Sequence, residues 1–150
     1  MNKEKSMIKA KTTQVIVMIT MMFLFTSDFI QGGSEMDENR IFTKGNRAPD
    51  AIFTNTVWVN MLHTDEDGAF DTQVYDVIFE PSARTFWHSH PGGQILLATS
   101  GTGYYQEKGK PARLLKKGDV VANPPEVEHW HGAAPDRGYV HNGMITQVHL

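Results

Sequence analysis

The chain of 150 residues contains no cysteine. Disulfide bonds, thiolate metal ligands, cysteine nucleophiles and a lipid anchor on cysteine are therefore excluded, and the redox compartment is left open. The chain also lacks an excess of positive charge, because 14 Lys and Arg residues stand against 17 Asp and Glu residues, for a formal net charge of −3. This balance gives no indication of nucleic acid as a partner.

Several regular patterns are missing as well. The sequence has no internal repeat, no low-complexity tract, no coiled-coil pattern and no convincing helical period. No serine lies in a nucleophile motif, and no pair of carboxylates has the spacing of a sugar hydrolase. Residues 100–103 (Ser-Gly-Thr-Gly) resemble a phosphate-binding loop, but no helix pattern follows them. We therefore expect a β-turn there.

An apolar run stands near the N-terminus. Four lysines precede residues 15–25, and this run of about 11 residues is short for a spanning helix, which needs roughly 20. We interpret residues 1–33 as a secretory signal peptide, with an uncleaved N-terminal membrane anchor as the alternative. The protein is then expected to be exported to a periplasm or secreted, touching a membrane only through this segment if it stays uncleaved.

The rest of the chain reads as one β-rich domain. Residues 34–50 are polar and broken by Gly and Pro, so we expect a linker or wrapping arm with little independent structure. Residues 51–150 have room for a single core. Within them, short β-rich runs are separated by turn residues, at 56–62, 73–79, 94–99, 104–107, 113–115, 120–122, 128–132 and 139–148. Such spacing predicts an antiparallel sandwich or barrel.

Histidines gather in two blocks marked by glycine and proline, residues 87–94 and 118–131. Side chains alternate along an extended strand, so His88 and His90 are expected to point the same way. The Pro-Gly-Gly bend that follows can return Gln94 to that face, and His129 can approach from another strand.

Three imidazoles and an amide oxygen suit a borderline divalent metal, with positions left open for solvent or substrate. Because an amide ligand carries no charge, the ion would keep nearly its full charge and act strongly as a Lewis acid. This donor set tolerates Mn, Fe, Co, Ni and Zn.

The two blocks resemble the two sequence motifs of the cupin superfamily, over about residues 45–141. The matching positions are His88, His90, Gly101, Gly118, Pro124 and His129. Gln94 stands where most cupins have glutamate, Ser82 and Glu126 replace motif glycines, and Ala133 replaces an asparagine. The resemblance implies an all-β fold, a single-domain cupin β-barrel of the jelly-roll type.

The chain is similar, more closely, to small bacterial cupins that include manganese-dependent hydroxynitrile lyases, the mandelonitrile lyase-like cupins. That resemblance implies His88, His90, Gln94 and His129 as metal ligands and manganese as the favoured ion. It also implies His141 as the acid/base and His131 as a further histidine with a catalytic or pocket role. These relatives continue past the strand around Met144, so we expect either a missing last strand or a shifted end.

Three functions remain open on these grounds. The first is a metal-dependent lyase acting on a small hydroxylated or carbonyl substrate, with cleavage or formation of a carbon–carbon bond to cyanide. The second is an iron-dependent dioxygenase that accepts O₂ at the open positions. The third is a non-catalytic, exported cupin that binds a metal, sugar or aromatic acid. A homodimer or homotetramer is expected under all three.

Overall fold

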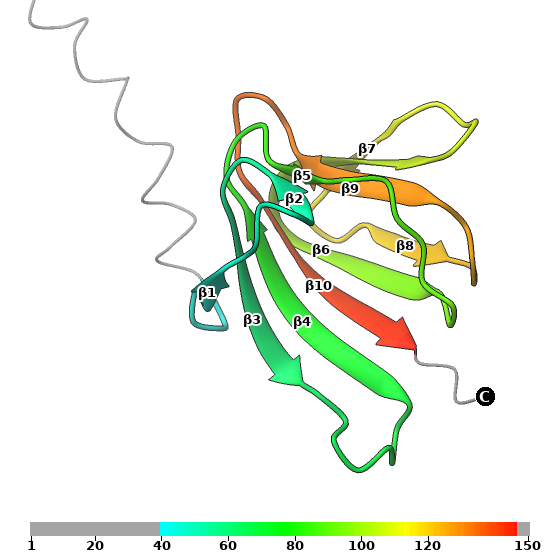
Figure 1. Cartoon of the computed structure of the whole chain (residues 1–150). Coiled ribbons are helices and arrows are strands. Elements are labelled where there is room, and N and C mark those ends of the chain that lie inside the picture. The colour runs from blue at the N-terminus through cyan, green and yellow to red at the C-terminus, as the bar shows by residue number, and fades with distance from the viewer. Residues whose placement is uncertain (1–39, 147–150) are drawn as a thin grey trace, which may run out of the picture. The chain divides into compact units, whose positions relative to one another are not determined.

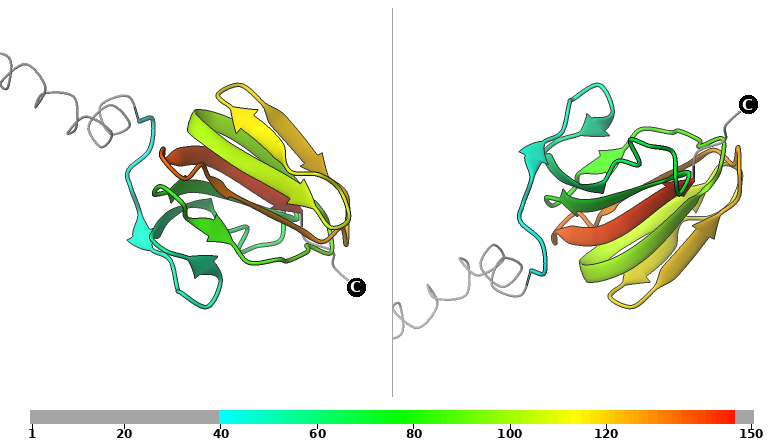
Figure 2. Two further views of the ribbon diagram at one scale, coloured as in Figure 1. Left: turned by 90° about the horizontal axis from the view of Figure 1, so that it is seen from above. Right: turned by 90° about the horizontal axis from the view of Figure 1, so that it is seen from below.

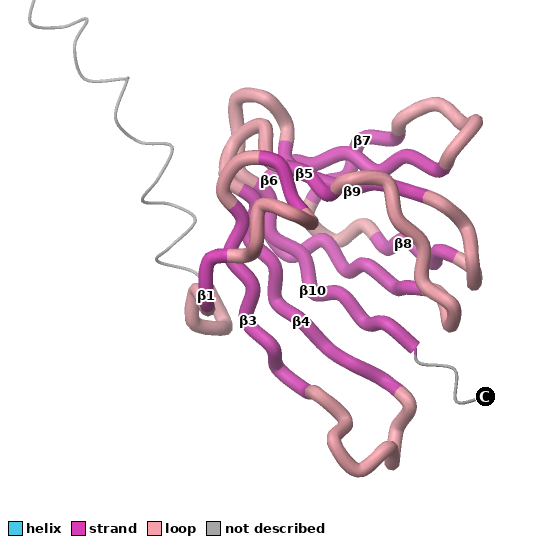
Figure 3. The backbone as a smooth tube through the Cα atoms, viewed as in Figure 1, coloured by secondary structure: helices cyan, strands magenta, loops and turns pink. Residues whose placement is uncertain are grey.

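The computed structural model describes residues 40–146, which form strands joined by turns and loops (Figure 3). The expected signal peptide, residues 34–39 of the expected linker and residues 147–150 lie outside the described residues. None of the described residues forms a helix long and apolar enough to cross a membrane.

The described residues form ten strands (Figure 1). They are β1 (Asn46–Arg47), β2 (Phe53–Thr54), β3 (Val57–His63), β4 (Thr72–Phe79), β5 (Arg84–Thr85), β6 (Gln94–Glu107), β7 (Arg113–Lys116), β8 (Val120–Asn123), β9 (His129–Ala133) and β10 (Tyr139–Thr146). All pairings between them are antiparallel, in the order β1-β3-β4-β10-β6-β9-β5-β2, with β7 and β8 also pairing β6. The all-β prediction is confirmed.

The long strand β6 joins two sheet layers that curl toward each other (Figure 2). Its first half pairs with β10 and β8, and its second half pairs with β9 and β7. Because one strand serves both layers, the residues of β9 and β10 can face a common interior. This arrangement positions the histidines of both strands.

Two of our expectations about β6 are wrong. The runs 94–99 and 104–107 form one strand of 14 residues, and residues 100–103 lie inside it rather than in a β-turn. Gly101 has φ +74°, and a Cβ there would lie 2.1 Å from the carbonyl oxygen of Gly138. The register between β6 and β10 shifts near this point, between Val140 and His141. The glycine therefore bends a continuous strand where a local reading suggests a turn.

The interior is filled by alternate residues of neighbouring strands. Phe79, Leu96 and Tyr139 are completely buried, and Tyr139 lies opposite Phe79 in the register of β10 and β4. His141 follows two residues later on the same face of β10, opposite Val77. The core therefore extends directly into the wall that carries His141.

Part of the expected arm belongs to the sheet. Strand β1 pairs with β3, and its neighbour Ala48 is buried in the core, with its N–H donating to the carbonyl of Val57 at 2.8 Å. At the other end, β10 lies between β4 and β6, so both of its edges are paired. The expectation of a missing strand after it stays a prediction.

The two residues that replace motif glycines keep a glycine-like backbone. Ser82 has φ 64° and Glu126 has φ 62°, both in the left-handed region. Hydrogen bonds hold each turn, from the N–H of Ser82 to the Ala134 carbonyl and from the N–H of Glu126 to the His90 carbonyl, both at 3.0 Å. The backbone of the turns is therefore retained at some cost in strain.

Candidate metal centre

His88 and His129 face each other across a short backbone bridge. His88 lies on the segment between β5 and β6, and His129 begins β9. The N–H of each residue donates to the carbonyl of the other, at 3.0 Å from His88 and 2.8 Å from His129. Their ring centroids are 4.3 Å apart. We expected an extended strand containing His88 and His90, but the structure forms only this isolated bridge at His88.

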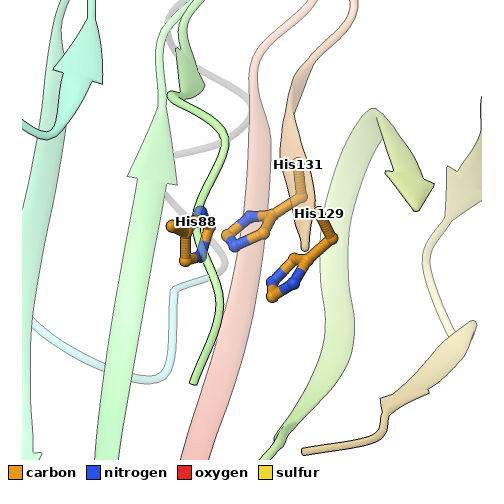
Figure 4. A group of neighbouring side chains, drawn as sticks. All are labelled: His88, His129 and His131. Atoms are coloured by element: carbon orange, nitrogen blue, oxygen red, sulfur yellow. The ribbon is translucent and has the colours of Figure 1, made fainter. Parts of the chain in front are cut away.

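His131 joins these two rings. It follows His129 by two residues on β9, and the two rings are nearly parallel with centroids 5.8 Å apart. Figure 4 shows both rings turned from β9 toward His88. The ligand atoms of the three histidines all lie within 4.8 Å of one another. Three imidazoles of the described residues are therefore grouped closely enough to hold one metal ion.

His90 and Gln94 approach the same cluster through the Pro-Gly-Gly bend. Gly93 has φ +84°, and its N–H donates to the His90 carbonyl at 3.0 Å. The His90 ring lies 5.0 Å from that of His88 and 5.8 Å from that of His129. The Oε1 atom of Gln94 lies 2.9 Å from Nε2 of His129. All four expected ligands are thus brought together.

Carbonyl oxygens orient two of the rings. Nδ1 of His88 lies 2.9 Å from the Phe86 carbonyl, and Nδ1 of His129 lies 2.9 Å from the Val127 carbonyl. A ring that donates its Nδ1–H to a carbonyl keeps a lone pair on Nε2, which is the form that binds a metal. The Phe86 carbonyl therefore favours Nε2 of His88 as the ligand atom.

An amide and a tyrosine also contact His129. Nδ2 of Asn123 lies 2.7 Å from its Nδ1, and the Tyr105 hydroxyl donates to Oδ1 of Asn123 at 2.7 Å. Both contacts are buried. Sequence reasoning missed these two residues, because Asn123 and Tyr105 stand on β8 and β6 and nothing local connects them with His129.

The donor atoms fit a divalent cation. Nε2 of His90 and both ring nitrogens of His131 are buried without a hydrogen-bond partner among the described residues. Such groups are costly to bury, and a bound cation would satisfy one nitrogen of each ring. The 2.9 Å between Gln94 Oε1 and His129 Nε2 also matches two neighbouring ligands at roughly 2.1 Å from one ion, which at a right angle lie about 3 Å apart.

Burial keeps these rings uncharged. Desolvation, together with the nearby His88 and His129, lowers the pKa of His90 to about 4. It likewise lowers the pKa of His129 to about 4, and it lowers the pKa of His88. Burial and the neighbouring His141 hold the pKa of His131 well below its usual value. Neutral imidazole is the form that coordinates a metal, so the cluster is ready to bind one near neutral pH.

His141 reaches the cluster from β10. Its ring stacks on Phe79 with centroids 5.5 Å apart and meets the His131 ring edge-on at 4.8 Å. The side chain is fully buried, and neither ring nitrogen has a hydrogen-bond partner within the part of the chain that the structure describes. Burial lowers the pKa of His141 to about 4. It therefore offers an uncharged ring with both nitrogens available to a bound molecule.

A cavity of about 400 Å³ lies beside these rings. Five residues of its wall are the polar groups already described: His88, His90, Gln94, His131 and His141. The remaining wall is largely apolar and includes Phe53, Val59, Val77 and Ile145. Its size and mixed lining are those of a small-molecule site.

The residues predicted as metal ligands therefore lie together in the structure, but the role of His131 differs from the prediction. Sequence reasoning placed His131 beside the metal, whereas the structure groups it with His88 and His129 as tightly as a ligand would be. Which of His90 and His131 completes the coordination stays a prediction. His63 lies outside the cluster, 3.7 Å from the carboxylate of Asp65.

Comparison with known proteins identifies the family of the chain. Residues 75–140 match the model of the cupin domain family. The chain is 42% identical over 95 residues to an (R)-mandelonitrile lyase of Granulicella tundricola, an alignment that covers 63% of this chain and 72% of that protein.

Solved structures give the same result. A cupin-like protein from Thermotoga maritima is 66% identical with a TM-score of 0.73, covering 74% of this chain and 84% of that one. A predicted oxalate decarboxylase from the same organism shares the fold, at 18% identity and a TM-score of 0.61, covering 69% and 91% of the two chains.

The curled antiparallel sheets and the histidine cluster define a small type of β-barrel whose grouped imidazoles could hold a metal ion. The chain belongs to the cupin superfamily and is similar there to the mandelonitrile lyase-like members.

Proposed function

We propose that this protein is a metal-dependent lyase that acts on a small hydroxylated or carbonyl substrate. The observation that carries the proposal is the position of His141, buried beside the imidazole cluster with no partner in residues 40–146 for either ring nitrogen. The similarity to an (R)-mandelonitrile lyase supports carbon–carbon bond cleavage or formation with cyanide as the reaction.

Some residues of the site bind the substrate or the metal, and His141 transfers the proton. The apolar wall around Phe53, Val59 and Val77 excludes water and holds the body of the substrate. The histidines and Gln94 would hold the metal, which when bound would supply Lewis acidity toward a substrate oxygen. His141 accepts the hydroxyl proton as the bond to cyanide breaks and passes it to the departing cyanide, which leaves as hydrogen cyanide. The same transfers run backwards in synthesis, and His141 is suited to them because it is uncharged and faces the cavity.

Manganese as the ion, export of the protein and a homodimer or homotetramer are further parts of this proposal. They are supported by the resemblance of the motifs and by the apolar N-terminal run. Elemental analysis of the purified protein, its fractionation from whole cells and its mass in solution test them one by one.

The catalytic proposal is tested by His141→Ala in the metal-loaded protein, assayed for cyanohydrin cleavage. We expect metal content to stay unchanged and turnover to fall by about 10²- to 10⁴-fold, the usual contribution of a general acid/base. The control is His63→Ala, which removes a histidine outside the cluster and should leave turnover unchanged.

Full turnover in His141→Ala would show that this ring only shapes the cavity. An assay without O₂ separates the lyase from the dioxygenase alternative, because the lyase reaction consumes no O₂ and should proceed at the same rate.

A further inference from the structure

Gly143 of β10 is a strand glycine that neither backbone packing nor backbone geometry requires. Gly101, Gly103 and Gly132 also lie within strands, and a Cβ added to them would lie 2.1 Å, 2.6 Å and 2.4 Å from a backbone oxygen. At Gly143 the nearest atom outside its chain neighbours would be 3.4 Å away, an ordinary contact. Its φ is also outside the left-handed region. A side chain would therefore fit at Gly143, where the other three strand glycines exclude one.

The space beside Gly143 opens onto the cavity. Gly143 lies between His141 and Ile145 at alternate positions of β10, and all three line the cavity. Its partners on the neighbouring strands are Tyr75 and Leu96, in a register that is regular at this point. Neither partner fills the place of the missing side chain, because the atoms nearest to a Cβ belong to other residues. A glycine inside a strand often marks a close approach by a ligand, and no bulge or backbone contact accounts for this one.

Two polar side chains border the space beside Gly143. A Cβ there would lie 3.4 Å from Cε1 and 3.6 Å from Nδ1 of His141, and 3.8 Å from Nε2 of Gln94. The other end of the Gln94 amide, Oε1, faces Nε2 of His129. Within residues 40–146, no group accepts a hydrogen bond from Nε2 of Gln94. The amide of Gln94 therefore directs an oxygen at the imidazole cluster and an unused N–H donor at this space.

We propose that the space beside Gly143 holds the nitrile group of the substrate, which departs as cyanide. The inference rests on the proposed function for the reaction. There the substrate oxygen faces the imidazole cluster and the apolar body contacts Phe53 and Val59, so the nitrile is the remaining polar group. A nitrile is a narrow rod with an acceptor nitrogen and no donor, which matches a space of methyl width bordered by the Gln94 N–H. The departing cyanide then lies beside His141, from which it takes its proton.

The test compares three probes in the full chain after treatment with a chelator. Benzonitrile carries the nitrile, phenylacetylene has nearly the same shape without an acceptor nitrogen, and benzene lacks the rod. Dissociation constants come from NMR titration, so neither a metal nor turnover enters the measurement. The unaltered chain should bind benzonitrile about threefold to tenfold more tightly than phenylacetylene, the size of one neutral hydrogen bond.

Gly143→Ala fills the space with one methyl group. It should weaken the binding of both rod-shaped probes by at least about tenfold, as for an overpacked site, and change benzene binding little. The urea concentration at half-unfolding should not fall, because the added Cβ makes only ordinary contacts and alanine is favoured over glycine in a strand. A purely structural role for Gly143 predicts the opposite, a loss of stability.

The matched variant Gln94→Met keeps the length of the side chain and removes the N–H donor. It should weaken benzonitrile by about threefold to tenfold and leave phenylacetylene unchanged. The infrared stretching frequency of bound benzonitrile should be higher in the unaltered chain than in Gln94→Met, because a nitrile that accepts a hydrogen bond absorbs at higher frequency.

Any of four results would overturn the inference: rod-shaped probes bound equally well by Gly143→Ala, benzene weakened as much as they are, a destabilised Gly143→Ala, or no binding of benzonitrile by the unaltered chain. Equal weakening of benzonitrile and phenylacetylene in Gln94→Met would remove the hydrogen bond from it. Failure of the lyase proposal would look different, as absent metal or absent cyanohydrin cleavage with the order of the probes intact.

Discussion

Two side-chain amides contact the His129 ring from opposite ends. Gln94 Oε1 approaches Nε2, and Asn123 Nδ2 approaches Nδ1. The first of these marks a chemical choice, because most cupins place a glutamate where this chain has Gln94. An uncharged amide leaves the positive charge of a bound ion uncompensated, which favours polarisation of a substrate oxygen over tight metal binding.

Gln94→Glu is therefore expected to change the affinity for the metal and the rate of turnover in opposite directions. The added negative charge should tighten metal binding by about tenfold and should lower turnover, because the ion becomes a weaker Lewis acid. Metal affinity is measured by competition with a chelator, and turnover by the cyanohydrin assay. Weaker metal binding, or faster turnover, would contradict this role for the amide.

The identity of the site residues could be predicted from the sequence, but their arrangement around the site could be predicted only in part. The alternation of His129 and His131 and the Pro-Gly-Gly bend before Gln94 are local features, and the structure brings these side chains together. The choice between His90 and His131 as ligand is not local. It depends on how two segments cross at the bridge of His88 and His129, which no spacing in the sequence specifies.

At the scale of elements, the strand β6 could not be predicted in full from local sequence. Its glycines are typical of a turn, but contacts with distant parts of the chain keep them within a strand. A Cβ at Gly103 would lie 2.6 Å from the Gly132 carbonyl oxygen, and one at Gly101 would meet the Gly138 carbonyl. Most strands could be placed from alternation and turn residues, whereas these close backbone approaches could not.

Gly132 allows a direct test of this close packing. A Cβ there would lie 2.4 Å from both the Ala83 carbonyl oxygen and Cβ of Arg84, so Gly132→Ala must push β5 and β9 apart. We expect the free energy of unfolding to fall by about 3 kcal/mol, as for an overpacked core. Urea unfolding measures the change.

Gly109→Ala is the matched control. Gly109 has a positive φ, +81°, which Gly132 lacks, and a Cβ added there would meet nothing within 4 Å, so only backbone strain of about 1 kcal/mol is expected. An equal loss of stability in the two variants would show that packing between β5 and β9 is not the reason for Gly132.

At the scale of the whole molecule, the fold buries several imidazole rings away from solvent. His129, His131 and His141 are all buried within one barrel. Burial lowers the pKa of His129 and of His141 to about 4, from an ordinary value of 6.5. In the unfolded chain the same rings take up protons as the pH falls below 6.5, while the folded protein does not. Acid therefore favours unfolding.

The metal-free protein should lose stability steeply between pH 7 and pH 5. Each ring that stays neutral only when folded contributes up to about 1.4 kcal/mol per pH unit in this window, and the loss levels off as the folded rings titrate near pH 4. Urea unfolding at a series of pH values measures the slope. A free energy of unfolding that is flat from pH 7 to pH 5 would contradict the burial of these rings as neutral groups.

The central claim is that the imidazoles and Gln94 hold one cation within this barrel. Its most direct test is elemental analysis of the metal-free protein after reloading with Mn²⁺ and removal of excess ion, alongside His129→Ala and the control His63→Ala. We predict one bound ion per chain in the unaltered protein and in His63→Ala, and less than a tenth of that, by order of magnitude, in folded His129→Ala. A full equivalent of metal in His129→Ala, or none in the folded, unaltered chain, would contradict the account.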